Sequence, residues 1–239
     1  MAILERDGAS IHYTMHGSGF PVLALAPGGM RSAGPWCERS PWNPVTELAG
    51  THRVIVMDQR NAGASTAPVT GGEDWSTYTA DQLGLLDHLG VDEFAVVGMC
   101  IGGPFILGLL RAAPERVARA VVIQSIGLDG NRDAFEESFG AWRDTIAADH
   151  PEAGPEQWDA YRAGMYAGDD PLWSVPTSVL PTITAPLLVL QGDDRFHPRS
   201  ASQLIASSVP GAVLVEHWHD DDLPAARETI AGFLAPLRP

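Results

Sequence analysis

The sequence predicts an α/β fold in which a mostly parallel sheet carries helices on both faces. Short apolar runs alternate with amphipathic stretches along most of the chain, and most of these runs are continuously apolar, as in strands buried on both faces. With 239 residues, of which 45% are apolar, the chain can bury a sizeable core in one generous domain or two small ones.

The expected elements follow in chain order. Residues 10–16 alternate apolar and polar side chains and lead into Gly-Ser-Gly at 17–19, so we expect an N-terminal hairpin. Residues 79–89 carry leucines at helical spacing and stop at Gly90, and residues 101–113 form a second helix before Pro114. Further strands are expected at residues 22–26, 53–58, 94–98, 117–124, 187–191 and 212–216.

Residues 129–184 interrupt this alternation with an aromatic, acidic and proline-broken segment, in which residues 135–148 and 155–167 have helical patterns. We interpret the segment as a lid or cap inserted into a core made of residues 1–128 and 185–239. Such an insertion would supply apolar walls to a substrate pocket. The alternative is an ordinary helical excursion of the core.

Charge and composition exclude several classes of function. Thirty acidic and fifteen basic residues give a net charge of −15, which disfavours nucleic acids and anionic membranes as partners. Every basic residue is an arginine, so a Schiff-base lysine, a pyridoxal enzyme and a P-loop lysine are excluded.

We expect a cytoplasmic protein. Charges at positions 5–7 stand where a signal peptide would be apolar, and the longest uncharged run, residues 94–110, is short for a bilayer and rich in glycine. Cys37 and Cys100 are too few for a four-cysteine zinc site and are expected to be free thiols.

The densest chemical signal is Gly-Met-Cys-Ile-Gly-Gly at residues 98–103, between a buried strand and an apolar helix. Glycines two positions before and after Cys100 suit a sharp strand-to-helix turn that strains the central residue and exposes its side chain. The positive end of the following helix favours the reactive thiolate. A buried structural cysteine, or a glycine pair that serves only close helix packing, is the alternative.

With its neighbours this pattern resembles the α/β-hydrolase fold family over nearly the whole chain, least in the insertion. Residues 26–30 (Ala-Pro-Gly-Gly-Met) are similar to the family's oxyanion loop, with Pro27 where histidine is usual. Residues 58–65 are similar to its next loop, with Asn61 in a glycine position. Cys100 stands where serine is usual, as in dienelactone hydrolases. The resemblance implies the α/β-hydrolase fold, with a small helical lid insertion.

The resemblance also implies that an acid and then a histidine complete a triad with Cys100. The expected acid is Asp194, which follows a predicted strand and stands four residues before Pro198; Asp193 is the rival.

His217 is the expected base, because an Asp-Leu-Pro element follows it at the family's spacing, and His219 is the alternative. His217, His219 and the three following aspartates are a loose ligand set, so a metal site there is a minor alternative and no metal is expected. The remaining histidines, including His197, are expected to be structural.

These roles imply that the Cys100 thiolate attacks an acyl carbonyl and forms a thioester. The backbone N–H groups of Ile101 and Gly29, with Met30 as a substitute for Gly29, would hold the oxyanion. Four side chains are expected to contact the substrate, and Arg31 among them could bind a carboxylate or could simply be solvated: Arg31, Trp36, Met99 and Trp142.

A thiolate suits activated acyl groups, so we predict a hydrolase of small esters or lactones that uses no cofactor and acts as a monomer or homodimer. Two alternatives remain open. The same triad could serve an acyltransferase or thioesterase, or the scaffold could be a non-catalytic ligand-binding protein.

Overall fold

The computed structural model of the chain describes residues 2–237, and its centre is one eight-stranded sheet. The strand order is β1-β2-β4-β3-β5-β6-β7-β8. The pairs from β4 to β8 in this order are parallel, and β2 is antiparallel to both of its neighbours, β1 and β4. The strand bounds are β1 Ala2–Arg6, β2 Ala9–His16, β3 Pro21–Leu25, β4 Arg53–Met57, β5 Phe94–Met99, β6 Val117–Ile123, β7 Leu187–Leu190 and β8 Val213–Val215.

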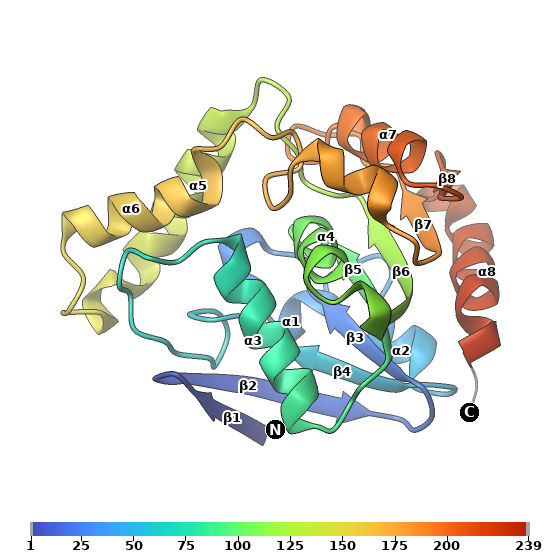
Figure 1. Ribbon diagram of the computed structural model, residues 1–239, viewed down its shortest axis with the longest axis horizontal. Helices are drawn as coiled ribbons and strands as arrows, with labels where there is room; N and C mark the ends of the chain where they lie inside the picture. The colour runs from blue at the N-terminus through green and yellow to red at the C-terminus, as the bar shows by residue number, and fades with distance from the viewer. Residues whose placement is uncertain (1, 238–239) are drawn as a thin grey trace.

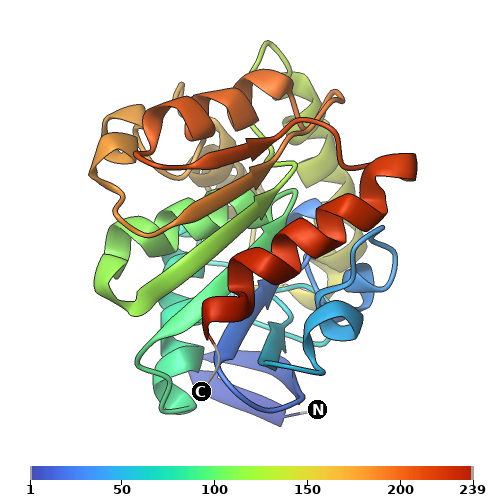
Figure 2. The same cartoon turned by 90° about the vertical axis from the view of Figure 1, so that its right-hand side faces the viewer.

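Helices cover both faces of this sheet, as predicted. One apolar cluster joins the sheet to α3, α4 and α7, and a second joins its other face to α1, α2 and α8. Figure 2 shows α8 crossing one face, with α3 and α4 on the far side. These helices span α1 Gly34–Cys37, α2 Pro44–Leu48, α3 Trp75–His88, α4 Gly102–Ala112, α7 Arg199–Ser208 and α8 Leu223–Leu234.

The order of the strands places a switch point beside β3. The chain passes from β3 to β4 on one side and then returns to β5 on the other. Loops that leave the carboxyl ends of β3 and β5 therefore diverge to opposite faces and leave a crevice between them, where parallel α/β sheets bind ligands. The 3₁₀ turn η1, Gly29–Arg31, follows β3 at this crevice, and Cys100 follows β5.

The N-terminal hairpin differs from the expectation in the position of its turn. The tight turn lies at Asp7 and Gly8, where both residues have positive φ, and it joins β1 to β2. The Gly-Ser-Gly sequence at 17–19 instead connects β2 to β3, and β2 pairs with β4. The alternating pattern identified the strand but not its partner, because the edge strand β1 has only five residues, most of them exposed, and carries a weak signal.

Within residues 129–184, α5 and α6 form a helical layer beyond the carboxyl ends of the parallel strands (Figure 1). Two helices, α5 Arg132–Ile146 and α6 Pro155–Tyr166, pack against each other, and α5 also packs against η1. Two short 3₁₀ turns belong to this segment: η3 Ala147–Asp149 follows α5, and η4 Thr177–Thr182 lies between α6 and β7. Another, η2 Pro114–Arg116, connects α4 to β6. The division into core and lid stays a prediction, but α5 reaches the switch point.

Two short 3₁₀ turns flank α8, namely η5 Asp220–Asp222 before it and η6 Ala235–Leu237 after it. Within residues 2–237, none of the helices is both long and apolar enough to cross a membrane.

Candidate active site

Cys100 stands at a tight turn between β5 and α4, in the left-handed region with φ 61°. Its N–H donates to the carbonyl of Ile123 at 3.0 Å, and its own carbonyl accepts from Gly103 and Ile126. A Cβ at residue 98 would lie 2.8 Å from the backbone of residue 102, so glycine is required for this close approach. The local sequence therefore forces a non-glycine residue into a strained conformation, which is typical of functional turns.

The thiol of Cys100 is surrounded by groups that stabilise its charged form. Burial alone would raise the pKa of Cys100, but the hydrogen bond and charge of His197 and the backbone N–H groups of Gly28 and Ile101 outweigh it. The pKa of Cys100 is therefore lowered from its ordinary value. The thiolate is the nucleophilic form, so this environment favours reaction.

His197 lies between Cys100 and Asp194. Its Nδ1 is 2.7 Å from Oδ2 of Asp194, while its buried Nε2 has no oxygen or nitrogen partner among residues 2–237 and faces the thiol. Burial would lower the pKa of His197, but the interactions with Cys100 and Asp194 raise it to about 9. The geometry is that of a nucleophile, a base and an acid that orients the base.

A short loop after β7 presents both the acid and the base. The Oδ1 atom of Asp194 accepts from the N–H groups of Phe196 and His197 at 2.8 and 3.0 Å. Burial opposes these bonds, yet the interactions with His197 and the two N–H groups hold the pKa of Asp194 below its usual value. The side chain of Asn131 donates to the carbonyl of Arg195 at 2.7 Å and fastens the loop to the start of α5.

The structure does not bring His217, the predicted base, to Cys100. After β8 the extended chain buries Trp218, whose Nε1 donates to the carbonyl of Gln191 at 2.8 Å. Because successive side chains of an extended segment point to opposite sides, His217 and His219 face outward and are exposed. The correction is that His197 takes the position next to the thiol.

Asp194 and not its rival Asp193 contacts the histidine. Asp193 is exposed and pairs with the guanidinium of Arg199 at 2.6 Å, and this pairing lowers its pKa. Of the predicted oxyanion donors, Ile101 has its N–H at the thiol, but the second N–H comes from Gly28. Gly29 lines the adjoining cavity, whereas Met30 is buried outside it.

A cavity of about 190 Å³ opens in front of Cys100. The helical layer supplies three of its walls from α5 and the end of α6, and the β7 loop supplies two more. The residues that line it are Gly28, Gly29, Cys100, Ile126, Phe135, Ser138, Tyr166, Phe196 and His197. Space of this size is small for a ligand site and suits a compact acyl group.

None of the four side chains predicted to contact the substrate lines this cavity. Arg31, Trp36 and Trp142 instead line a separate hollow of about 410 Å³ on the other side of η1, where Arg31 donates to the carbonyl of Ala141. Met99 is buried near Ser40, whose hydroxyl lies 3.1 Å from its sulfur. A further hollow of about 520 Å³ lies beside β2 and Cys37 and is lined by neither Cys100 nor His197.

Sequence reasoning missed His197, Gly28, Ser138 and Tyr166. A histidine three residues after an acid at the end of a buried strand was an available signal for His197. The positions of the other three residues near Cys100 depend on how α5 and α6 pack against residues 26–30, which no local pattern reports. No group of three or more His, Cys, Asp or Glu side chains in the described part of the chain could hold a metal ion.

A comparison with protein families gives one match over most of the chain. The profile of a family described as alpha/beta hydrolase fold matches residues 21–192. This range holds the turn at Cys100, residues 26–30 and strand β7.

Relatives and solved structures agree with this match. The chain is 27% identical to a protein named putative carbamate hydrolase RutD from Azorhizobium caulinodans, over 87% of this chain and 86% of that protein. It is 33% identical to a 2-hydroxymuconate semialdehyde hydrolase of Pseudomonas putida, but over only 47% of this chain and 38% of that one.

Among solved structures, Est816, described as an N-acyl homoserine lactone degrading enzyme, superposes with a TM-score of 0.71. It shares 26% identity and covers 97% of this chain and 100% of its own. An enol-lactonase from Burkholderia xenovorans LB400 gives a TM-score of 0.73 at 21% identity, with 98% and 100% coverage, and supports the fold alone.

Proposed function

Because the chain belongs to the alpha/beta hydrolase fold family, we propose that it hydrolyses a small activated ester or lactone through Cys100, His197 and Asp194. The prediction of a hydrolase-type enzyme is confirmed by its relatives. The observation that carries the finer proposal is the contact between a strained cysteine at the switch point and a histidine held by a carboxylate.

The first half of the reaction forms a thioester. The Cys100 thiolate attacks the acyl carbonyl, and the N–H groups of Gly28 and Ile101 hold the resulting oxyanion, each typically worth ~3 kcal/mol of barrier. The protonated His197 donates its Nε2 proton to the leaving oxygen as the carbon–oxygen bond breaks, and Asp194 keeps the ring oriented.

The second half returns the enzyme to its starting state. Neutral His197 takes a proton from water, the water oxygen attacks the thioester carbonyl, and the carbon–sulfur bond breaks to release the acid and the thiolate. The imidazolium then stabilises the thiolate again. Every step uses groups of a single chain and one water molecule. We therefore propose that the enzyme needs no cofactor and that a monomer is sufficient.

Two further observations support an ester or lactone as substrate. Thiolate attack is best suited to activated acyl groups, and a relative of 26% identity is described as degrading N-acyl homoserine lactones. Both cysteines are free in the structure, which suits the cytoplasmic location that we propose.

The test is a turnover screen of aryl esters, lactones and thioesters with wild type, Cys100→Ala and Cys100→Ser. We expect an acyl adduct on Cys100 in intact-protein mass spectra after brief incubation with an activated ester, and loss of turnover in Cys100→Ala. Full turnover by Cys100→Ala would overturn the proposal.

A further inference from the structure

We infer that the acyl group of the substrate carries an oxygen on the carbon next to its carbonyl, as in a 2-alkoxy-, 2-hydroxy- or 2-oxoacyl compound. The hydroxyls of Tyr166 and Ser138 bind this oxygen. The inference rests on the proposed function, because it places the acyl half of the substrate in the cavity in front of Cys100.

The cavity offers more hydrogen-bond donors than a simple acyl group can use. In the proposed mechanism the carbonyl oxygen binds the N–H groups of Gly28 and Ile101, and the leaving oxygen takes its proton from His197; all three groups face the thiol in the structure. Three of the remaining walls, Ile126, Phe135 and Phe196, have no polar side-chain atoms. Tyr166 and Ser138 are the remaining lining residues that carry a side-chain hydroxyl.

The Tyr166 hydroxyl is a buried donor with a poor partner. It donates to the sulfur of Met30 at 3.6 Å, and a thioether is a weak acceptor. Burial raises the pKa of Tyr166, and nearby Tyr78 and Cys100 raise it further, so the hydroxyl keeps its proton at neutral pH. Leaving a buried donor poorly satisfied costs free energy that a ligand oxygen would recover.

The Ser138 hydroxyl lies near Gly29, in the loop after β3. It makes no hydrogen bond to any of residues 2–237, and a Cβ built on Gly29 would lie 3.8 Å from its oxygen. Tyr166 therefore approaches Met30, and Ser138 approaches Gly29. These two residues directly follow Gly28, whose N–H faces the thiol. An oxygen bound by both hydroxyls would sit close to the acyl carbonyl.

The experiment compares two esters that differ by one atom. In 4-nitrophenyl methoxyacetate an ether oxygen replaces one methylene of 4-nitrophenyl butanoate, so both have the same leaving group and acyl length. The ratio of their kcat/KM values is measured in wild type, Tyr166→Phe and Ser138→Ala. Dividing a variant's ratio by that of wild type cancels the intrinsic reactivity of the two esters.

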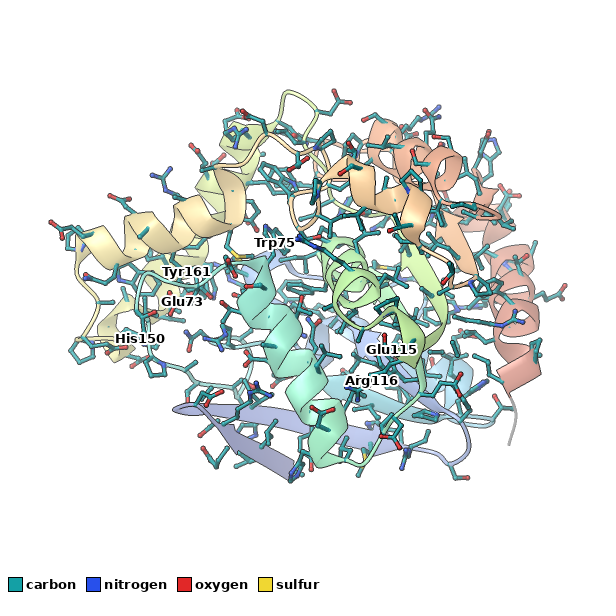
Figure 3. All side chains as sticks on the ribbon, viewed as in Figure 1. Glu73, Trp75, Glu115, Arg116, His150 and Tyr161 are labelled. Carbon is teal, nitrogen blue, oxygen red and sulfur yellow. The ribbon has the colours of Figure 1, made fainter. Side chains whose placement is uncertain are left out.

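We expect the ratio to fall about tenfold in Tyr166→Phe and about threefold or more in Ser138→Ala, as for loss of one hydrogen bond each. Tyr161→Phe is the matched control. Tyr161 lies on the same helix as Tyr166 and beside Glu73 (Figure 3), but its hydroxyl is bonded to Tyr78 at 2.5 Å and does not line the cavity. Its ratio should equal that of wild type.

An unchanged ratio in both Tyr166→Phe and Ser138→Ala, or an equal fall in Tyr161→Phe, would overturn the inference. Failure of the proposed function is detected separately. It would appear as turnover that survives Cys100→Ala or as the lack of an acyl adduct on Cys100, whatever the ester ratio.

Discussion

The charge on Cys100 and His197 decides whether this site can react at neutral pH. The pKa of the thiol is lowered and that of the imidazole is raised to about 9, so each group favours the charged form of the other. Both shifts favour the pair of a thiolate and an imidazolium over the pair of neutral groups. Acid removes the nucleophile by protonating the thiolate, and alkali removes the proton that the leaving oxygen needs.

This reasoning predicts how the two cysteines differ toward iodoacetamide. At pH 7 Cys100 should be alkylated faster than a free cysteine, because its lowered pKa gives it a larger fraction of thiolate. Cys37 should react very slowly, because burial, with help from Asp58 and Glu38, raises its pKa to about 12. Peptide mass spectrometry against pH measures both rates, and Cys37 serves as the internal control. Preferential labelling of Cys37 would contradict the assignment.

The choice between His197 and His217 gives a second prediction at this scale. His197→Asn should lower kcat/KM by 10² to 10⁴, the usual range for loss of a general acid–base group. It should also raise the pH at which Cys100 becomes alkylated. The alkaline limb of the wild-type pH–rate profile should lie near pH 9.

His217→Asn is the matched control. Its side chain is exposed, so the substitution should change kcat/KM by less than about twofold. The reverse pattern, with activity lost in His217→Asn and kept in His197→Asn, would restore the triad first expected from the sequence.

The sequence predicted Cys100, Asp194 and Ile101 because each has a local pattern, a strand end or a turn, that determines its position. It did not predict His197, because the choice of histidine depends on which side chain of the 217–219 segment is buried. Burial of the large Trp218 turns both neighbouring histidines outward, and no spacing rule reports that competition.

At the scale of elements, the turn between β5 and α4 is held by close backbone packing as well as by hydrogen bonds. A Cβ at residue 103 would lie 2.1 Å from Oγ of Ser125, which is fully buried. The start of α4 can therefore approach β6 only if residue 103 is glycine. This packing fixes the position of the thiol relative to the oxyanion loop.

We predict that Gly103→Ala destabilises the protein by about 1–3 kcal/mol through overpacking, lowering Tm by roughly 2–12 °C. Gly140→Ala is the control, since residue 140 lies in α5 with no atom within 4 Å of an added Cβ. That change should raise stability by up to about 1 kcal/mol, as expected for alanine in a helix. Equal Tm values for the two variants in thermal unfolding would contradict the packing argument.

The buried parallel strands and the long helices could be predicted from sequence, because continuous apolar runs and helical spacing are strong local signals. The short helices α1 and α2 could not, since four or five residues are too few to display a period. The helical layer was predicted as a segment, but its contact with η1 depends on tertiary packing. For this reason the sequence could not indicate which side chains line the cavity in front of Cys100.

At the scale of the whole molecule, net charge opposes folding. The chain carries −15, and nearly all ion pairs among the described residues have at least one well-exposed partner, so they add little stability. The pair of Arg60 and Asp81, at 2.8 Å, is buried on both sides and is screened little by salt. Repulsion among the excess acids is spread over the surface, where salt screens it well.

Raising NaCl from about 0.02 to 0.5 M should therefore increase Tm by a few degrees, because the Debye length falls to roughly 4 Å and long-range repulsion weakens more than contact pairs do. Differential scanning calorimetry at pH 7.5 measures the change. The same titration at pH 5, near the sequence pI of 4.7, is the control, since little net charge remains to be screened and the increase should largely disappear. A Tm that falls with salt at pH 7.5 would mean that attractive surface pairs outweigh the repulsion of the excess carboxylates.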